Sequence, residues 1–314
     1  SLNYNHDSEE TIGNFLENSA EYSHIYNCSE PRNTTKNQPK PYTTSTLQQA
    51  ASNELRISPK ITMAACQKLY EEGYITYMRT DSTTYSKEFL NVADKFITKA
   101  YGESFVREDL ASLSERSDTK KKKSKKEKEN TAQEAHEAIR PTNIATLKAD
   151  EKLGSRECRI YNLIRRNTLE SCMAPATYKA ITATISAPEN HEYRCSSEQI
   201  VFPGWKAVSG VEEKCDIYNF LLTLKKKQEI PYKKIVSKVS MKDLKTHYTE
   251  AKLVQLLEQN GIGRPSTFSS LVDKIQERGY VKKDNVKGKS VKCVDFELTE
   301  DELIENENMR EFGN

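Results

Sequence analysis

The sequence predicts an α+β protein built from more than one domain. Three observations lead to this prediction: helical spacing of apolar residues over 43–102, strand-like alternation through much of 178–239, and a repeat that returns the first helical pattern after Thr249. A chain of 314 residues is long enough for about two or three domains. The composition, with 36% hydrophobic and 30% charged residues, is ordinary for a globular protein.

The first 40 residues carry little patterning. They are polar and rich in Asn, Ser and Glu, and they predict at most a strand or two joined by loops. Pro39 and Pro41, on either side of Lys40, indicate a linker into the next segment.

Residues 43–73 predict two consecutive helices. Ser58 and Pro59 provide the N-cap and the first-turn proline of the second helix, and Gly73 is placed to end it. A third helix is predicted over 86–102. Four apolar residues share one face of the first helix: Leu47, Ala50, Ala51 and Leu55.

A lysine-rich stretch interrupts the pattern at 118–130, which contains seven lysines. Such a run repels itself and cannot build a core, so we expect a disordered loop. Two interpretations stay open, a solvated insertion without a role and an arm that follows DNA.

Beyond Pro175 the pattern becomes strand-like. Alternating or β-prone residues predict strands at Tyr178–Ser186, Ile200–Val208, Leu221–Leu224 and Ile235–Val239. From Thr249 the helical pattern returns.

An internal repeat relates the two helical regions. When the chain is shifted by 206 residues, nine of the 34 positions from Tyr42 to Ile75 are identical, whereas chance gives about two or three. Because the shared proline enters a second helix and the shared glycine leaves it, each copy predicts helix, turn, helix and a short strand. This shape is common in DNA-binding proteins, although helix pairs also occur without DNA.

Several classes of protein are disfavoured. No run of 18 apolar residues predicts a membrane span, and the first residues do not resemble a signal peptide. The seven cysteines form no Cys-x-x-Cys pair, which disfavours zinc and indicates a reduced, intracellular protein. A net charge of +2 means that any DNA-binding surface must be local.

Tyr77 and Arg79 are the residues best suited to catalysis. They lie in and just after the β-prone segment Tyr74–Met78, where side chains two residues apart point the same way. A phenol with a pKa of about 10 needs help to become a nucleophile. A neighbouring guanidinium lowers that pKa, binds phosphate through two hydrogen bonds and stabilises developing charge. By spacing alone, a strand tyrosine beside a surface arginine remains the commoner interpretation.

Three segments, in this order along the chain, resemble the motifs of type IA DNA topoisomerases. Lys68–Ser82 resembles the active-site motif, in which the tyrosine before Met-Arg-Thr-Asp-Ser attacks DNA. Gln133–Pro141 is similar to the second motif and Gly261–Thr267 to the third. The similarity runs from about Pro41 to Val281, and the residues around Met78 and Arg264 match the bacterial topoisomerase I branch.

The resemblance implies a toroidal, multidomain core. Residues 1–40 and 175–245 would form a β-rich hinge domain. Residues 41–174 would form a winged-helix-like domain that carries the catalytic tyrosine, and 246–314 a truncated helical domain that grips single-stranded DNA.

The resemblance also implies the reaction. Tyr77, assisted by Arg79, would attack one strand and form a 5′-phosphotyrosine, and religation after strand passage would relax negatively supercoiled DNA without ATP. Six residues are implied as DNA contacts: His136, Arg140, Arg264, Ser266, Thr267 and Arg278.

One part of the family pattern is missing. The family carries a TOPRIM domain whose acidic cluster holds Mg²⁺, and nothing before Lys40 resembles it. We therefore expect a fragment or one half of a split enzyme, inactive alone, with the Mg²⁺ ligands in a TOPRIM-bearing partner and no metal ligand here. We further expect a monomer without a membrane partner, in the cytoplasm, at the nucleoid if bacterial.

Two other functions remain open. A non-catalytic paralogue would bind single-stranded DNA without cutting it, but the presence of both Tyr77 and Arg79 disfavours this. The topoisomerase part of a reverse gyrase would work beside an ATP-driven motor, and no Gly-x-x-x-x-Gly-Lys loop occurs in this sequence.

Overall fold

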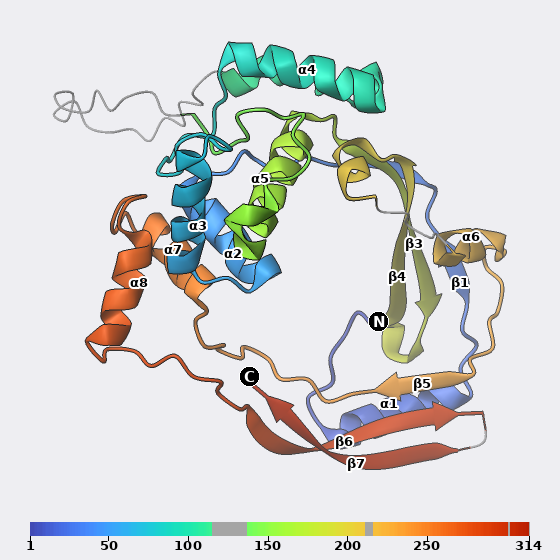
Figure 1. Ribbon diagram of the computed structural model, residues 1–314. Helices are drawn as coiled ribbons and strands as arrows, with labels where there is room; N and C mark the ends of the chain where they lie inside the picture. The colour runs from blue at the N-terminus through green and yellow to red at the C-terminus, as the bar shows by residue number, and fades with distance from the viewer. Residues whose placement is uncertain (115–136, 211–215, 301, 314) are drawn as a thin grey trace, which may run out of the picture.

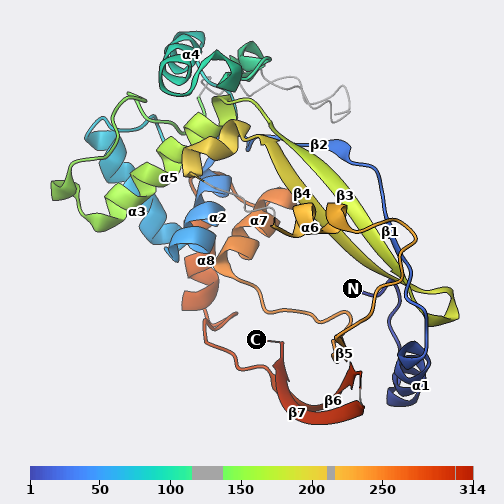
Figure 2. The same ribbon diagram turned by 90° about the vertical axis from the view of Figure 1, so that its right-hand side faces the viewer.

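The computed structural model describes residues 1–114, 137–210, 216–300 and 302–313, and its helices and strands are arranged in a ring (Figure 1). The lysine-rich stretch lies outside the described residues. In the view of Figure 2, α4 and the β5–β7 sheet lie at opposite ends of the molecule. The mixed helix and sheet content confirms the α+β class, and the ring agrees with the toroidal expectation.

The three helices predicted in the first half are confirmed as α2 (Thr44–Leu55), α3 (Pro59–Glu71) and α4 (Lys87–Tyr101). Each begins at a hydroxyl residue, Thr43, Ser58 or Ser86, whose side chain accepts a hydrogen bond from a backbone N–H of the first turn. Gly73 follows α3 with φ +73°, a left-handed conformation that glycine adopts without strain.

A further helix, α5 (Ser155–Cys172), completes the core of this region. It packs against α2 and α3, and Ile160 and Ile164 on α5 are buried with Leu47, Ala51 and Leu69. Burying a side chain of this kind stabilises the fold by about 1.5–3 kcal/mol. The apolar stripe predicted on the first helix is therefore the face that builds the core.

Two antiparallel sheets form the other side of the ring. In the first, β3 (Ala176–Ser186) pairs along its length with β4 (Glu192–Phe202), and shorter segments of β3 pair with β1 (Tyr26–Cys28) and β2 (Arg32–Lys36). The second has the order β5 (Lys234–Ser237), β6 (Lys289–Thr299) and β7 (Leu303–Phe312).

The first region in which the sequence expectation was wrong is the polar N-terminus. Residues 1–40 contain a helix, α1 (Glu9–Ala20), besides two short strands, and α1 packs against β6. Phe15 and Leu16 are its principal buried apolar residues. So narrow an apolar stripe is hard to detect among polar residues.

Two predicted strands are also corrected. Leu221–Leu224 falls mainly in a helix, α6 (Asp216–Thr223), where Tyr218 and Leu221 are buried on one face. Of the segment Ile200–Val208, only the first residues belong to β4, and Gly204–Ser209 forms a 3₁₀ helix. The helical character expected for 246–314 holds for α7 (Glu250–Gln259) and α8 (Phe268–Glu277). It is wrong for Lys289–Thr299 and Leu303–Phe312, which form strands β6 and β7; β6 pairs with β5, and β7 pairs with β6.

The helix pairs of the internal repeat are confirmed. Under the shift of 206 residues α2 corresponds to α7 and α3 to α8, and Gly279 has φ +72°, like Gly73. The predicted strand after each pair is not formed in the described residues, where Tyr74–Met78 contains a single bridge, between Ile75 and Pro141. The winged-helix part of the prediction is therefore not supported.

The two helix pairs close the ring. Helix α2 packs against α7, and α3 packs against α8 (Figure 1). Ser45 donates a hydrogen bond to Glu258 at 2.7 Å, and Lys60 forms an ion pair with Asp273 at 3.1 Å. Both contacts join the start of a helix in the first pair to the second half of its partner, so the paired helices run antiparallel.

No helix in the described part of the chain combines the length and the apolar character that crossing a membrane requires.

Candidate active site

The segment that carries Tyr77 is held by the first residue of α2. The Thr44 hydroxyl lies 2.7 Å from the carbonyl oxygen of Met78 and accepts a hydrogen bond from the backbone N–H of Thr80 at 2.9 Å. The backbone N–H of Thr44 donates to the carbonyl oxygen of Thr80 at 2.9 Å. Because Thr44 is fully buried, water does not compete for these bonds.

No strand forms in this segment, and its burial alternates only from Met78 onward. Met78 and Thr80 are buried, whereas Tyr77 is half-buried and Arg79 is exposed. The ring of Tyr77 packs edge-to-face on that of Tyr70, with 5.4 Å between centroids. Arg79 therefore reaches solvent, whereas Tyr77 packs partly against the core that α2, α3 and α5 form.

The second motif is hydrogen-bonded to the tyrosine segment. The backbone N–H of Thr76 donates to the carbonyl oxygen of Arg140 at 2.9 Å. The Thr76 hydroxyl donates to the carbonyl oxygen of Ala138 at 3.0 Å. On its other side, Ile139 donates from its backbone N–H to the carbonyl oxygen of Tyr42 at 2.9 Å. Two motifs about 60 residues apart in sequence thus form one unit.

The side chain of Arg140 is engaged within this unit. Its guanidinium forms an ion pair with Glu137, donates to the carbonyl oxygen of Pro141 at 3.0 Å and lies over the Phe89 ring at 4.2 Å. Through these contacts Arg140 holds the second motif against α4. A contact of Arg140 with DNA stays a prediction. His136 lies outside the described residues.

The third motif forms an exposed turn in front of α8. The Thr267 hydroxyl accepts from the backbone N–H of Arg264 at 2.8 Å, and the side chains of Arg264, Ser266 and Thr267 are exposed. These residues precede α8, which begins at Phe268 with Thr267 at its N-cap position.

The antiparallel packing of α3 and α8 decides which candidates lie near one another. It places the turn at Arg264 at the same end of the helix pair as the segment of Tyr77, which follows α3 (Figure 1). Arg278 follows the other end of α8, near the start of α3. The structure therefore brings the three motifs to one end and separates Arg278 from them.

The residues present do not fit a metal site. Within the described ranges no three His, Cys, Asp or Glu side chains gather closely enough to hold an ion.

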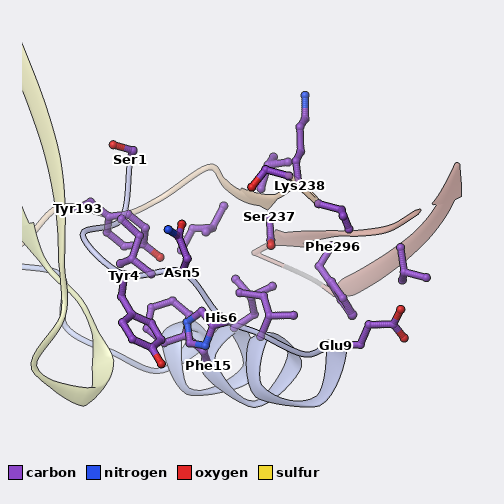
Figure 3. Close-up of a pocket in the computed structure, with 18 of the residues that line it drawn as sticks. Ser1, Tyr4, Asn5, His6, Glu9, Phe15, Tyr193, Ser237, Lys238 and Phe296 are labelled. Carbon is purple, nitrogen blue, oxygen red and sulfur yellow. The ribbon is translucent and has the colours of Figure 1, made fainter. Parts of the chain in front are cut away.

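A hollow of about 1400 Å³ lies between the N-terminal segment, α1 and the β5–β6 strands (Figure 3). Its lining includes His6, Phe15, Tyr193, Lys238 and Phe296. Burial lowers the pKa of His6, which favours the neutral imidazole in this aromatic environment. The lining contains none of the candidate site residues.

The sequence analysis missed Thr44 and Thr76, whose hydroxyls position the tyrosine segment. The available signal was weak, since Thr44 is one of several hydroxyl residues at the start of a predicted helix.

Replacing Thr44 with valine tests the positioning role. We expect Thr44→Val to lower the free energy of unfolding in urea by about 1–3 kcal/mol, because the N–H of Thr80 and the carbonyl of Met78 would be buried without this partner. Thr98→Val, at an exposed position of α4, should change it by less than about 0.5 kcal/mol. Equal stability of both variants would contradict the role of Thr44.

The sequence and the fold of this chain are both similar to those of DNA topoisomerases. A family model described as DNA topoisomerase matches residues 2–302. DNA topoisomerase 1 of Buchnera aphidicola is 38% identical over 245 residues, covering 78% of this chain and 27% of that protein. The Escherichia coli K12 enzyme of the same name is 34% identical over 288 residues, covering 91% and 31%. Full-length topoisomerase I from Thermotoga maritima aligns with a TM-score of 0.64 at 26% identity, covering 90% of this chain and 45% of that one. The chain thus spans less than a third of the length of these two curated relatives.

Proposed function

Because the chain belongs to the type IA DNA topoisomerase family, we propose that it is the part of such an enzyme that cuts one DNA strand and moves it aside. Tyr77 attacks the phosphodiester and becomes joined to the 5′-phosphate, leaving a free 3′-hydroxyl. Since the new bond keeps the energy of the phosphodiester, religation needs no ATP. Arg79 stabilises the charge on the phosphate oxygens during attack.

The observation that supports this proposal best is the joining of the first two motifs. Tyr77 sits on an extended segment fixed by Thr44 on one side and by residues 138–142 on the other. A nucleophile gains most from being held near its attack geometry, and this segment is tied down by buried hydrogen bonds.

The ring provides the route for strand passage. The region from α2 to α5 is joined covalently to the β3 sheet, whereas in the described residues it meets α7 and α8 through non-covalent contacts, which include the Ser45–Glu258 hydrogen bond and the Lys60–Asp273 ion pair. Separation of these packed surfaces would carry Tyr77, with its attached DNA end, away from the third motif. We propose that the second strand passes through this opening.

Two further components of the reaction are proposed here, the Mg²⁺ site and the DNA substrate. We propose that a TOPRIM-bearing part of the enzyme supplies the Mg²⁺ site, and that the substrate is single-stranded or negatively supercoiled DNA. The whole enzyme would act as a monomer in the cytoplasm, at the nucleoid if the source is a bacterium.

A chimera tests the proposal. Residues 2–302 would replace the matching part of the Escherichia coli enzyme, with the parent enzyme as control. With Mg²⁺ and a labelled single strand, we expect a covalent adduct on this chain through the 5′-phosphate, together with relaxation of negatively supercoiled plasmid. Binding without an adduct would favour the non-catalytic paralogue, and ATP-dependent positive supercoiling would favour the reverse gyrase assignment.

The proposed DNA contact of the third motif can be tested on the 314-residue chain itself. Arg264→Ala should weaken single-strand binding for all sequences and lower the slope of log K against log salt by about 0.7, the value for one lost phosphate contact. Lys99→Ala, at an exposed position of α4, is the matched control and should leave the slope unchanged. An unchanged slope for Arg264→Ala would show that this arginine does not bind phosphate.

A further inference from the structure

The second helix pair has an apolar hollow that the described part of the chain leaves open. The hollow, here called the α7–α8 groove, measures about 260 Å³. Most of its lining is aliphatic: Leu253, Leu256, Leu257, Leu271, Val272 and Ile275. All of these residues except Val272 are only half-buried.

The internal repeat shows what covers the equivalent surface of the first helix pair. Under the shift of 206 residues, Leu253 corresponds to Leu47. Ile275 corresponds to Leu69 in the same way. Both counterparts are fully buried in the core that α2, α3 and α5 form, because α5 packs on α2 and on α3. The open groove shows that no described helix takes the place of α5 in the second pair.

The tyrosines at the two ends of the repeat show the same difference. Tyr42 is buried, and its carbonyl oxygen accepts a hydrogen bond from the second motif. The Tyr74 hydroxyl accepts a hydrogen bond from the backbone N–H of Asp150 at 3.2 Å. Their counterparts Tyr248 and Tyr280 are 69% and 72% exposed. The second pair is therefore bare where the first pair contacts the second motif and the residues that follow it.

A lysine shared by both copies lies beside this surface. Lys68 in α3 donates a hydrogen bond to the carbonyl oxygen of Leu153 at 2.7 Å, just before α5 begins. Its counterpart Lys274 in α8 is exposed and directly precedes Ile275 of the groove. Lys274 is thus placed to bind a carbonyl oxygen at the start of a covering helix, as Lys68 does.

The groove does not overlap the contacts that close the ring. Glu258 contacts α2, and Asp273 contacts α3. Glu258 stands two residues after Leu256, and residues two apart in a helix point to nearly opposite sides. Asp273 stands two residues before Ile275 in the same way. The groove therefore faces away from α2 and α3, and α8 lies at the outer edge of the ring (Figure 1).

The lining also indicates the size of the side chains that the groove accepts. Three alanines of the first pair are replaced by leucines in the second pair: Ala50 by Leu256, Ala51 by Leu257 and Ala65 by Leu271. Because packed interiors leave few voids, a covering helix must present smaller side chains here than the isoleucines of α5. An amphipathic helix with alanine or valine on its apolar face fits this requirement.

We propose that the α7–α8 groove binds such an amphipathic helix, supplied by another part of the same enzyme. Hydrophobic grooves between helices accept the apolar face of a further helix, as the first pair accepts α5. The matched region is 27% of the Buchnera aphidicola protein and 31% of the Escherichia coli protein, so these relatives contain much further chain. The source of the helix rests on the proposed function, in which this chain is one part of a larger topoisomerase. Bound there, the helix would keep the second pair attached to the rest of the enzyme while α2 and α3 move away.

Hydroxyl-radical footprinting tests this proposal without DNA and without activity. In the 314-residue chain, Leu253 should be modified more than Leu47, the identical residue at the equivalent buried position. In the chimera with the Escherichia coli enzyme, whose remaining part supplies the helix, modification of Leu253 should fall to the level of Leu47. Modification of Ile275 should fall as well. Val92 on α4, which is 52% exposed, is the control and should be modified equally in both proteins.

A substitution in the groove provides a second test. Leu256 lines the groove but lies outside the buried cluster of the second pair, so Leu256→Glu should shift the melting temperature of the 314-residue chain by less than about 2 °C. In the chimera the buried charge should expel the helix, and Leu253 should be modified as strongly as in the chain alone. Val92→Glu is the matched control and should leave Leu253 protected.

The possible outcomes separate this proposal from the proposed function. Full modification of Leu253 in a folded chimera would overturn the groove proposal, whether or not that chimera cleaves DNA. Protection that grows with the concentration of the 314-residue chain alone would assign the groove to a second copy and would overturn it as well. Protection in a chimera that fails to cleave would reject the proposed function and keep the groove. Protection of the buried core residue Ile160 reports folding, and a chimera with the Buchnera aphidicola protein, which is 38% identical, repeats the comparison in a second host.

Discussion

Tyr77→Phe is expected to abolish the covalent protein–DNA adduct completely. The substitution removes only the phenolic oxygen, which is the proposed attacking atom, and keeps the ring that packs on Tyr70. In the chimera with Mg²⁺, the adduct should disappear on a denaturing gel and plasmid relaxation should stop. Binding of single-stranded DNA should stay within about twofold, because the exposed turn at Arg264 is unaltered.

The neighbouring tyrosines provide the controls for this prediction. Tyr70→Phe changes the partner ring by the same single atom and should leave cleavage intact. Peptide mapping of the adduct formed by the unmodified chimera identifies the residue directly. An adduct on any tyrosine other than Tyr77 would contradict the assignment.

Arg79→Lys is expected to reduce the rate of cleavage by roughly 10²–10³, the usual effect of losing one donor to the transition state. Lysine keeps the charge but loses the planar group that binds a phosphate through two parallel hydrogen bonds. Arg79 is exposed between buried neighbours, so the substitution should leave the melting temperature nearly unchanged. Single-turnover cleavage at saturating DNA separates this effect from weaker binding.

Arg194→Lys is the matched control for Arg79→Lys. Arg194 is an exposed arginine on β4 that pairs with Glu192, far along the chain from the three motifs. The Arg194→Lys variant should cleave DNA at the same rate as the unsubstituted chimera. If Arg79→Lys also cleaves at that rate, Arg79 is a surface residue without a catalytic role.

The two copies of the repeat share their helices but differ in the segments that come after the second helix. In the first copy the chain after Gly73 is tied to residues 138–142, and Ile75 is buried. In the second copy Tyr280 and Val281 are exposed, and Lys283, at the position equivalent to Tyr77, pairs with Glu250 at 2.8 Å. Within the described residues, therefore, only the first copy has a partner segment, residues 138–142, that holds the chain after its second helix. This difference supports our proposal that one copy cuts while the other binds.

The sequence by itself determined the local structure of the helical regions and the identity of the motifs. Apolar spacing and hydroxyl caps predicted α2, α3 and α4, since both signals act within a few residues of the chain. The same signals misjudged α1 and α6, whose buried faces consist of only a few residues. Strands β6 and β7 were not anticipated. They form a hairpin with each other, and β6 reaches the rest of the fold by pairing with β5 more than 50 residues earlier in the chain.

The tertiary structure alone decided how the motifs meet. Thr44 binds the segment of Tyr77, Thr76 binds the second motif, and α3 places the third motif at the same end by packing against α8. These contacts join segments that are far apart in the sequence. Because a local pattern of residues acts only within a few positions, it does not specify which distant segments pack together.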